Sequence, residues 1–186
     1  ISKTKSENIK NLKVIKGDLR HINDIRKVFE TSRKEKKSID AVIHLAGLKA
    51  VGESCLQPFR YWENNLISSI NLLKVLDQYN CRNIVFSSSA TVYGEPDVFP
   101  TPETFISQQT SLYGASKISC EAFIQAYSNY GYFKSTIFRF VSWIGNGYSH
   151  GVIYDFVQKL LMNPKELKIL GDGNQEKSYL DVRDGV

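Results

Sequence analysis

The stretch SLYGASK, residues 111–117, holds the two residues whose types and spacing could do acid–base chemistry. Tyr113 and Lys117 lie four positions apart, and residues with that spacing share one face of a helix. A phenol has a pKa of about 10 in water, so it is a poor base at neutral pH. A neighbouring ammonium favours the phenolate and moves the pKa of the phenol toward the range in which a general base works. The pair is therefore a candidate acid–base device, although an ordinary surface pair can have the same spacing.

Short apolar runs alternate along the chain with segments that have the 3.6-residue period of a helix. The strands and helices that they predict must position Tyr113 and Lys117. Predicted strands cover residues 12–16, 41–45, 83–86, 136–139 and 167–170. Predicted helices cover residues 23–37 with Asn23 as the cap, 58–79, 111–131 with Ser111 as the cap, and 151–161. Such alternation predicts an α/β fold whose parallel sheet is covered by helices on both faces.

Small and polar residues follow the predicted strands, where parallel sheets bind their ligands. Asp18 and Leu19 follow the first strand, and residues 46–49, 87–94 and 141–145 follow the next three. Small residues let a ligand approach the backbone closely. These strand ends are therefore expected to converge with Tyr113 and Lys117 on one crevice.

The composition is that of a globular protein, with 42% hydrophobic and 23% charged residues among 186. No apolar run reaches the roughly 18 residues of a membrane span, so no membrane partner is expected. The net charge of +5 includes a basic cluster at residues 33–37 with no aromatic residue among the charges. A helix C-terminus explains that cluster better than nucleic-acid binding does.

The three cysteines, Cys55, Cys81 and Cys120, are odd in number and widely spaced, without a CxxC pair. This pattern predicts reduced thiols in a cytoplasmic protein and no metal site.

Five motifs together resemble the extended short-chain dehydrogenase/reductase family, and within it the UDP-glucose 4-epimerase branch. They are GDLR (17–20), HLAGLKAVGES (44–54), YWENN (61–65), NIVFSSSATVYGEP (83–96) and SLYGASK. The resemblance extends over nearly the whole chain, and HLAGLKAVGES followed by SSSATVYG is its most specific part. It implies a doubly wound, Rossmann-like parallel sheet that is incomplete here. Residues 1–140 would form a partial NAD-binding domain, and residues 141–186 would begin the substrate-binding portion.

The resemblance also implies roles for particular residues. The cofactor-binding set for NAD is Asp18, Leu19, Ala46, Gly47, Lys49, Asn65, Ser87, Tyr113 and Lys117. The catalytic set is Tyr113, Lys117 and Ser89, and the substrate-binding set is Ser89, Tyr113, Ser142 and Lys177. Within these sets, Asp18 and Leu19 would contact the adenine, and Ser89 would hydrogen-bond the sugar O4. Simpler alternatives stay open: Ser87 or Ser88 could face the crevice instead of Ser89, Asn65 could be a polar helix-start residue, and Asp18 could serve only its turn.

The chain departs from the family pattern in three ways. It has no glycine-rich GxxGxxG turn, so it is expected to be an internal fragment that is inactive alone, without its first strand–helix unit and its C-terminal substrate region. Ser142 and Trp143 stand where the family carries Asn-Pro, and Lys177 stands where it carries an arginine. Lysine keeps the charge of arginine but not its bidentate fork. The substrate is therefore expected to be a UDP-hexose, with glucose/galactose and their N-acetyl forms both open.

The expected function is an NAD-dependent sugar-nucleotide 4-epimerase that interconverts UDP-glucose and UDP-galactose through a 4-keto sugar and is a homodimer when full length. Another sugar-nucleotide epimerase and a 4,6-dehydratase of the same family are alternatives. A dehydratase places Asp and Glu after the Ser/Thr, whereas Ala90 and Thr91 follow Ser89 here. A non-catalytic dinucleotide-sensing protein is the alternative from another class, and such proteins often lose the tyrosine.

Overall fold

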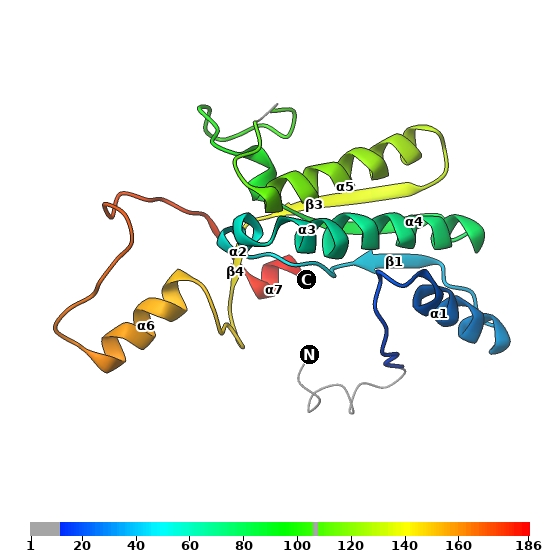
Figure 1. Ribbon diagram of the computed structural model, residues 1–186, viewed down its shortest axis with the longest axis horizontal. Coiled ribbons are helices and arrows are strands. Elements are labelled where there is room, and N and C mark those ends of the chain that lie inside the picture. The colour runs from blue at the N-terminus through cyan, green and yellow to red at the C-terminus, as the bar shows by residue number, and fades with distance from the viewer. Residues whose placement is uncertain (1–11, 106–107) are drawn as a thin grey trace. The chain divides into compact units, whose positions relative to one another are not determined.

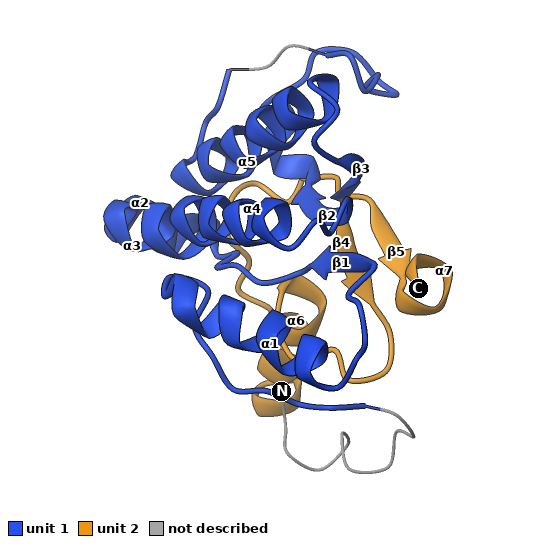
Figure 2. Cartoon of the chain, turned by 90° about the vertical axis from the view of Figure 1, so that its right-hand side faces the viewer, with its two compact units in different colours: residues 1–139 blue, residues 140–186 orange. Residues whose placement is uncertain are grey.

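A computed structural model describes residues 12–105 and 108–186. The chain divides after Arg139 into two compact units, which Figure 2 colours separately. Each unit is described by itself below. Figure 1 labels the elements along the chain.

The first unit contains a three-stranded sheet in the order β1-β2-β3. The strands are β1 (Ala41–His44), β2 (Asn83–Ser89) and β3 (Lys134–Phe140), whose last residue begins the second unit. β1 runs parallel to β2, with Ala41 opposite Asn83 and His44 opposite Phe86. Their short apolar and β-branched runs suit a pleated surface buried on at least one face. Three of the five predicted strands are therefore confirmed, and so is the Rossmann-like α/β class.

Helices α1 (Ile22–Lys34), α4 (Ser68–Gln78) and α5 (Leu112–Asn129) lie on the same side of the three strands (Figure 2). One apolar core joins these helices to the sheet. Its members include Ile25, Phe29, Leu72, Leu73, Leu76, Ile84, Phe86 and Ile124. Each such side chain contributes about 1.5–3 kcal/mol when it is fully buried, so this core fixes α5 against β2. On the opposite face of β1, Ile43 remains 66% exposed.

The prediction that Asn23 caps the first helix is wrong. The helix begins at Ile22, with His21 in the cap position. The Asn23 side chain instead accepts a hydrogen bond of 3.1 Å from Arg26, one turn further along the helix.

The predicted helix over residues 58–79 is present, but it contains an irregular turn. It consists of α3 (Pro58–Tyr61), the π-helix η1 (Trp62–Ile67) and α4. π turns are rare and are often found at functional sites. Two further elements complete this unit: the short helix α2 (Val51–Leu56) and the 3₁₀ helix η2 (Ala90–Tyr93).

The predicted strand over residues 12–16 is wrong. These residues have no regular secondary structure, and Leu12 and Val14 are 48% and 71% exposed. A strand exists only where a neighbour completes its hydrogen-bond ladder. No strand among the described residues pairs with this segment.

The second unit contains a two-stranded parallel sheet and two helices. β4 (Ser142–Ile144) pairs with β5 (Tyr179–Asp181), and the helices are α6 (Val152–Met162) and α7 (Val182–Gly185). The helix predicted over 151–161 is thus confirmed. The strand predicted over 167–170 is wrong, because this segment lies beside no described strand and Leu170 is 88% exposed. Among the described helices of either unit, none is both long and apolar enough to cross a membrane.

Candidate active site

The N-terminus of α5 is held by two serine side chains. Ser111 occupies the cap position that the sequence predicts, and its hydroxyl accepts a hydrogen bond of 3.0 Å from the Gly114 amide. The Ser54 hydroxyl, from α2, accepts a 3.1 Å bond from the Tyr113 amide and donates to the Val51 carbonyl. The first-turn amides of a helix need such acceptors. Both contacts fix the position of Tyr113.

Tyr113 lies beside Ser89 at the carboxyl end of β2. Its side chain is only 7% exposed, and its ring packs edge-on against Tyr61 with 6.4 Å between ring centroids. Burial raises the pKa of the Tyr113 phenol, while a hydrogen bond with the Ser89 side chain lowers it. Since burial has the larger effect, the phenol holds its proton at neutral pH.

Lys117 lies one turn further along α5 and is 5% exposed. Its Nζ donates a 2.8 Å hydrogen bond to the Ser87 carbonyl and lies 4.9 Å from the centroid of the Phe86 ring. Burial lowers the pKa of Lys117, an effect that Cys120 and Glu121 partly offset. In this structure the ammonium is directed to a carbonyl, and burial raises the pKa of the Tyr113 phenol. That Lys117 and a bound nicotinamide ring together favour the phenolate stays a prediction.

Only one of the three serines that end β2 shares a hydrogen bond with the tyrosine. Ser89 does so, and it also donates a 3.0 Å bond to Thr91 Oγ1. Ser87 contributes its carbonyl to Lys117. Ser88 is 4% exposed and donates its hydroxyl to the Glu121 carboxylate. Because side chains alternate along a strand, Ser88 points the other way from its two neighbours.

Asn65 holds the loop that follows β1. Its Oδ1 accepts a 2.8 Å bond from the Leu48 amide, and its Nδ2 donates to the Leu48 carbonyl at 3.0 Å and to Ser116 Oγ at 2.9 Å. Both amide protons are therefore used within the protein, and the residue is 2% exposed. Asn65 is neither a simple helix-start residue nor an open ligand group. It fixes the backbone beside Gly47.

The loop itself presents two small residues and a lysine to solvent. Ala46, Gly47 and Lys49 are exposed. A Cβ at Gly47 would lie 3.1 Å from Asn65 Oδ1 and 3.5 Å from Lys117 Nζ. Gly47 therefore brings this loop next to the ammonium of Lys117. An exposed backbone of small residues beside a cation has the chemistry that the phosphate and ribose groups of a dinucleotide require, so these residues fit NAD.

His44 and Ser69 form a buried hydrogen-bonded group next to Asn65, and the sequence did not predict it. His44 Nε2 lies 2.9 Å from Ser69 Oγ, and Ser69 donates a 2.6 Å bond to the Asn65 carbonyl in η1. Burial and, to a smaller extent, the nearby Lys117 together lower the pKa of His44 to about 4. His44 is therefore neutral at pH 7. His44 within HLAGLKAVGES could have been singled out from the sequence, but its partner Ser69 could not, because it lies 25 residues away.

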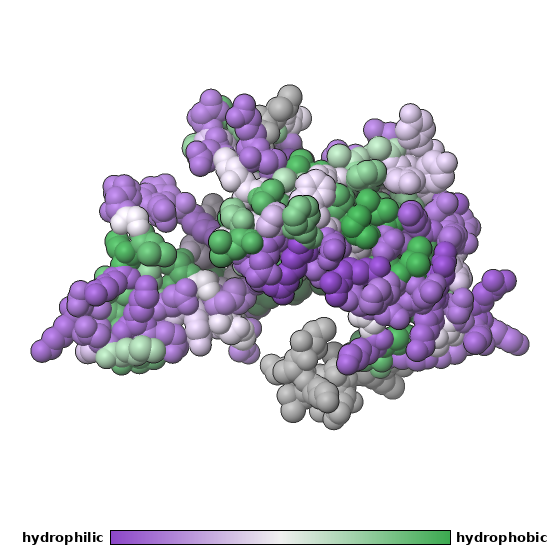
Figure 3. Space-filling view, viewed as in Figure 1, coloured by the Kyte–Doolittle hydropathy of each residue, from purple (hydrophilic) through white to green (hydrophobic). Residues whose placement is uncertain are grey.

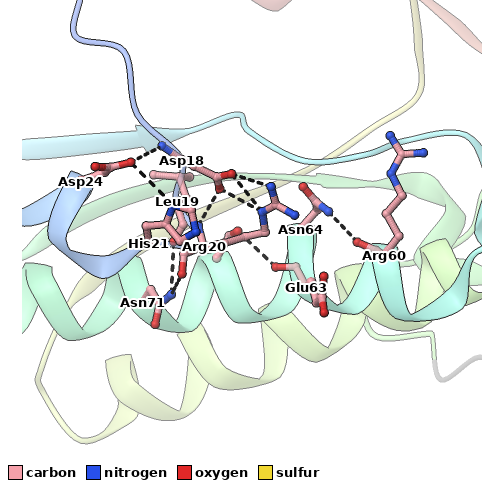
Figure 4. Close-up of polar contacts among 10 residues, drawn as sticks. Asp18, Leu19, Arg20, His21, Asp24, Arg60, Glu63, Asn64 and Asn71 are labelled. Atoms are coloured by element: carbon pink, nitrogen blue, oxygen red, sulfur yellow. Dashed lines mark hydrogen bonds and ion pairs between the residues drawn. The ribbon is translucent and has the colours of Figure 1, made fainter.

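Asp18 carries a local ion pair (Figure 4). The Arg20 guanidinium donates to both Asp18 carboxylate oxygens, with distances of 2.6 Å from Nη2 and 3.0 Å from Nε to Oδ2. These bonds, together with the Arg20 amide, lower the pKa of Asp18 to about 2. Asn71 Nδ2 donates to the carbonyls of Leu19 and Arg20 and ties this turn to α4. The Leu19 side chain packs against the core.

Ser142 and Lys177, the two remaining candidate residues, belong to the second unit. Ser142 begins β4 opposite Tyr179, and Lys177 lies two residues before that partner. Lys177 is exposed and Ser142 is partly buried.

A concavity of about 550 Å³ lies away from all of these residues. It is lined at the start of β1 and β2 and at the ends of α1 and α4 by residues that include Arg33, Lys37, Asp40, Tyr79 and Arg82. None of the candidate residues lines it, so this concavity is not the candidate active site. Among the described residues, no cluster of three or more His, Cys, Asp or Glu side chains could hold a metal ion.

The geometry defines a Rossmann-like unit whose tyrosine, lysine and serine meet at the carboxyl end of a parallel strand. The NAD dependent epimerase/dehydratase family matches residues 1–186, and the chain belongs to that family. A bifunctional UDP-glucose 4-epimerase and UDP-xylose 4-epimerase from Pisum sativum is 50% identical over 111 residues, which are 60% of this chain and 30% of the pea protein.

Two solved structures share the fold. UDP-glucose 4-epimerase from Bifidobacterium longum, in complex with NAD⁺ and UDP, is 32% identical with a TM-score of 0.77 over 93% of this chain and 56% of that one. UDP-N-acetylglucosamine 4-epimerase from Methanobrevibacter ruminantium M1, in complex with UDP-N-acetylmuramic acid, is 30% identical and has a TM-score of 0.77. The match covers 95% of this chain and 56% of that one. The chain spans about half the length of these structures.

Proposed function

We propose that the complete protein containing this chain is an NAD-dependent sugar-nucleotide 4-epimerase acting on UDP-hexoses, with UDP-glucose and UDP-galactose as the preferred pair. The observation that carries the proposal is the meeting of Tyr113, Ser89 and Lys117 at the end of β2. The family match and the names of the relatives agree with it. A 4,6-dehydratase is disfavoured, because Ala90 and Thr91 follow Ser89 and neither is an acid or a base.

In this proposal the residues of the chain bind, orient and move a proton. NAD, when bound, supplies the hydride acceptor and donor for C4 of the sugar. Tyr113 would act as a phenolate, the form that the positive charge of bound NAD⁺ and the Lys117 ammonium would favour. The phenolate would take the proton from the sugar O4 and later return it, while Ser89 donates or accepts a hydrogen bond at the same oxygen. Lys117 and the backbone of residues 46–49 hold the ribose and phosphate groups, and Asn65 keeps that backbone in place.

The decisive experiment compares the complete protein with its Tyr113→Phe variant. UDP-galactose is supplied, and the formation of UDP-glucose is measured. We expect the wild type to be active and the variant to lose roughly 10²–10⁴-fold in kcat, as is typical of a lost acid–base group. The variant should keep its unfolding midpoint, because only one hydroxyl is removed. An active Tyr113→Phe enzyme, or a wild type without epimerase activity, contradicts the proposal.

The sugar and the roles of the two units are part of the same proposal. We assign cofactor binding to the first unit and the beginning of the substrate site to the second, through Ser142 and Lys177. The relatives include both a UDP-glucose and a UDP-N-acetylglucosamine enzyme. Assays with both pairs of sugars, repeated for Ser142→Asn, test this assignment. A substrate carrying a nucleotide other than UDP would overturn it.

We also propose a homodimer. Exposed apolar side chains on α2, α3 and η1 support it, with Leu56, Phe59 and Trp62 at 84%, 81% and 41% exposure. Figure 3 shows hydrophobic areas over the region in which Figure 1 draws α3, α4 and α5. Sedimentation of the complete protein should give a dimer, and Phe59→Lys should weaken it. The three cysteines are free, which supports a cytoplasmic location, since disulfides are rare there.

A further inference from the structure

An ion pair with a buried carboxylate contacts Ser88, the residue that precedes Ser89 in β2. Glu121 is 1% exposed, and its carboxylate accepts hydrogen bonds from Arg139 Nε at 3.1 Å and from Arg139 Nη2 at 2.8 Å. The same carboxylate accepts the Ser88 hydroxyl. The pair therefore joins α5, β3 and β2 at one point, one residue before Ser89.

Arg139 extends this connection to the segment that follows β2. Its Nη1 donates a 2.8 Å bond to the Glu103 carbonyl, and its guanidinium carbon lies 4.8 Å from the centroid of the Tyr93 ring. Tyr93 ends η2, the 3₁₀ helix that begins directly after Ser89. The segments on both sides of Ser89 thus contact one guanidinium–carboxylate pair, whose carboxylate is buried and whose guanidinium is partly exposed.

The spacing along α5 relates this pair to the site. Tyr113, Lys117 and Glu121 are separated by four residues each, so they share one face of the helix. All three contact the end of β2: Tyr113 at Ser89, Lys117 at Phe86 and Ser87, and Glu121 at Ser88. Side chains on a helix lean toward its N-terminus, which lets Glu121 reach back to Ser88.

We propose that Glu121 and Arg139 are positioning residues for the reaction: through Ser88 they hold the end of β2 so that Ser89 and Tyr113 share one substrate oxygen. This inference rests on the proposed function for its kinetic consequence. Stability alone is a weak reason to bury the Glu121 carboxylate in such a pair, because the cost of desolvating the charges often equals their attraction. A requirement for fixed geometry is a better reason, since a displacement of about 1 Å can cost roughly 10²-fold in rate.

The test uses the complete protein and the mild variant Ser88→Ala, with Ser119→Ala as the matched control. Ser119 is a serine of α5 itself, and its hydroxyl donates to the Ala115 carbonyl of the same helix instead of joining α5 to β2. We expect Ser88→Ala to lower kcat about tenfold, the effect of one lost hydrogen bond to a charged group, with KM for the UDP-sugar unchanged. Ser119→Ala should change kcat less than about twofold.

Two further measurements separate positioning from general stability. In a Tyr113→Phe background, Ser88→Ala should have no further effect on the residual rate, because the contact that it positions is already lost. Hydrogen exchange of the backbone amides of residues 87–91 should be about tenfold faster in Ser88→Ala than in wild type or Ser119→Ala. Glu121→Gln should show the same pattern with a larger loss of kcat, roughly 10²-fold.

Unchanged exchange at residues 87–91 overturns the inference, and so does a kcat loss that persists in the Tyr113→Phe background. The exchange measurement needs no activity, so it decides the positioning claim even if the epimerase assay fails. Failure of the assay in the wild type refutes the proposed function instead.

Discussion

Asn65→Ala should reveal how much of the site depends on one buried amide. The Asn65 side chain makes three hydrogen bonds of 2.8–3.0 Å, two to the Leu48 backbone and one to Ser116. Alanine removes all three and leaves a small cavity at a position that is 2% exposed in the wild type.

The magnitude follows from these partners. A typical intramolecular hydrogen bond contributes about 1 kcal/mol net, and a buried partner left without one costs more. The two Leu48 groups lie in a partly exposed loop where water can replace the amide, whereas Ser116 is fully buried. Water lowers the cost at Leu48 but not at Ser116, so we expect a loss of about 3 kcal/mol in the free energy of unfolding.

The assay is urea unfolding of the complete protein, followed by titration with NAD. Asn64→Ala is the matched control, because Asn64 is the preceding residue of η1 and makes one bond, of 2.8 Å, to the Arg60 carbonyl. The control should lose under about 1 kcal/mol. Asn65→Ala should also bind NAD more weakly, since the loop of Gly47 and Leu48 is released. Equal unfolding free energies for the two variants would refute the reasoning.

Three other changes test separate parts of the structure. Gly47→Ala should destabilise the protein by about 1–3 kcal/mol in urea unfolding, because the added Cβ would lie 3.1 Å from the restrained Asn65 Oδ1. The control Gly52→Ala should be neutral or stabilising in the same assay, because nothing lies within 4 Å of a Cβ at that position. The pKa of His44 falls from 6.5 in the unfolded chain to about 4 in the folded protein. Between pH 6.5 and 4 the unfolded chain therefore binds a proton that the folded protein does not. The free energy of unfolding should decrease as the pH falls through this range, by about 3 kcal/mol in total. Unfolding curves measured between pH 7 and 4 should show this loss, and a His44→Gln variant that keeps the same slope contradicts the assignment. Ser54→Ala should cost about 1–2 kcal/mol by thermal unfolding, because the buried Tyr113 amide loses its acceptor; no loss would mean that Ser111 alone suffices as a cap.

Local patterns predicted the elements that carry the site. The apolar runs gave β1, β2 and β3, and Ser111 marked the start of α5 correctly. Such signals lie within a few residues of one another, so a sequence shows them directly. The predicted strands 12–16 and 167–170 failed for the same reason: a local pattern contains no information on whether a partner strand lies alongside.

The sequence could not predict where polar side chains find their partners. Asn65 lies in η1, whose π geometry breaks the 3.6-residue period that predicted a regular helix. Its amide meets Leu48, 17 residues away, and Ser116, 51 residues away. Likewise, the proximity of Lys117 to Tyr113 suggested a direct effect on the pKa of the phenol, but the ammonium bonds to the Ser87 carbonyl. The sequence spacing places the two side chains on one face without fixing their directions.

Three separate contacts between α5 and β2 fix the position of the helix along its axis. A shift of α5 by one residue along its axis moves every side chain by 1.5 Å. That shift exceeds the roughly 0.5 Å within which a catalytic group must be held, and it would break the contacts of Tyr113, Lys117 and Glu121 together. These contacts are chemically different: a hydrogen bond between hydroxyls, an ammonium on a carbonyl, and a carboxylate that also binds Arg139. No single alternative position of the helix can satisfy all three, so the buried charges at Lys117 and Glu121 fix the register that places Tyr113 beside Ser89.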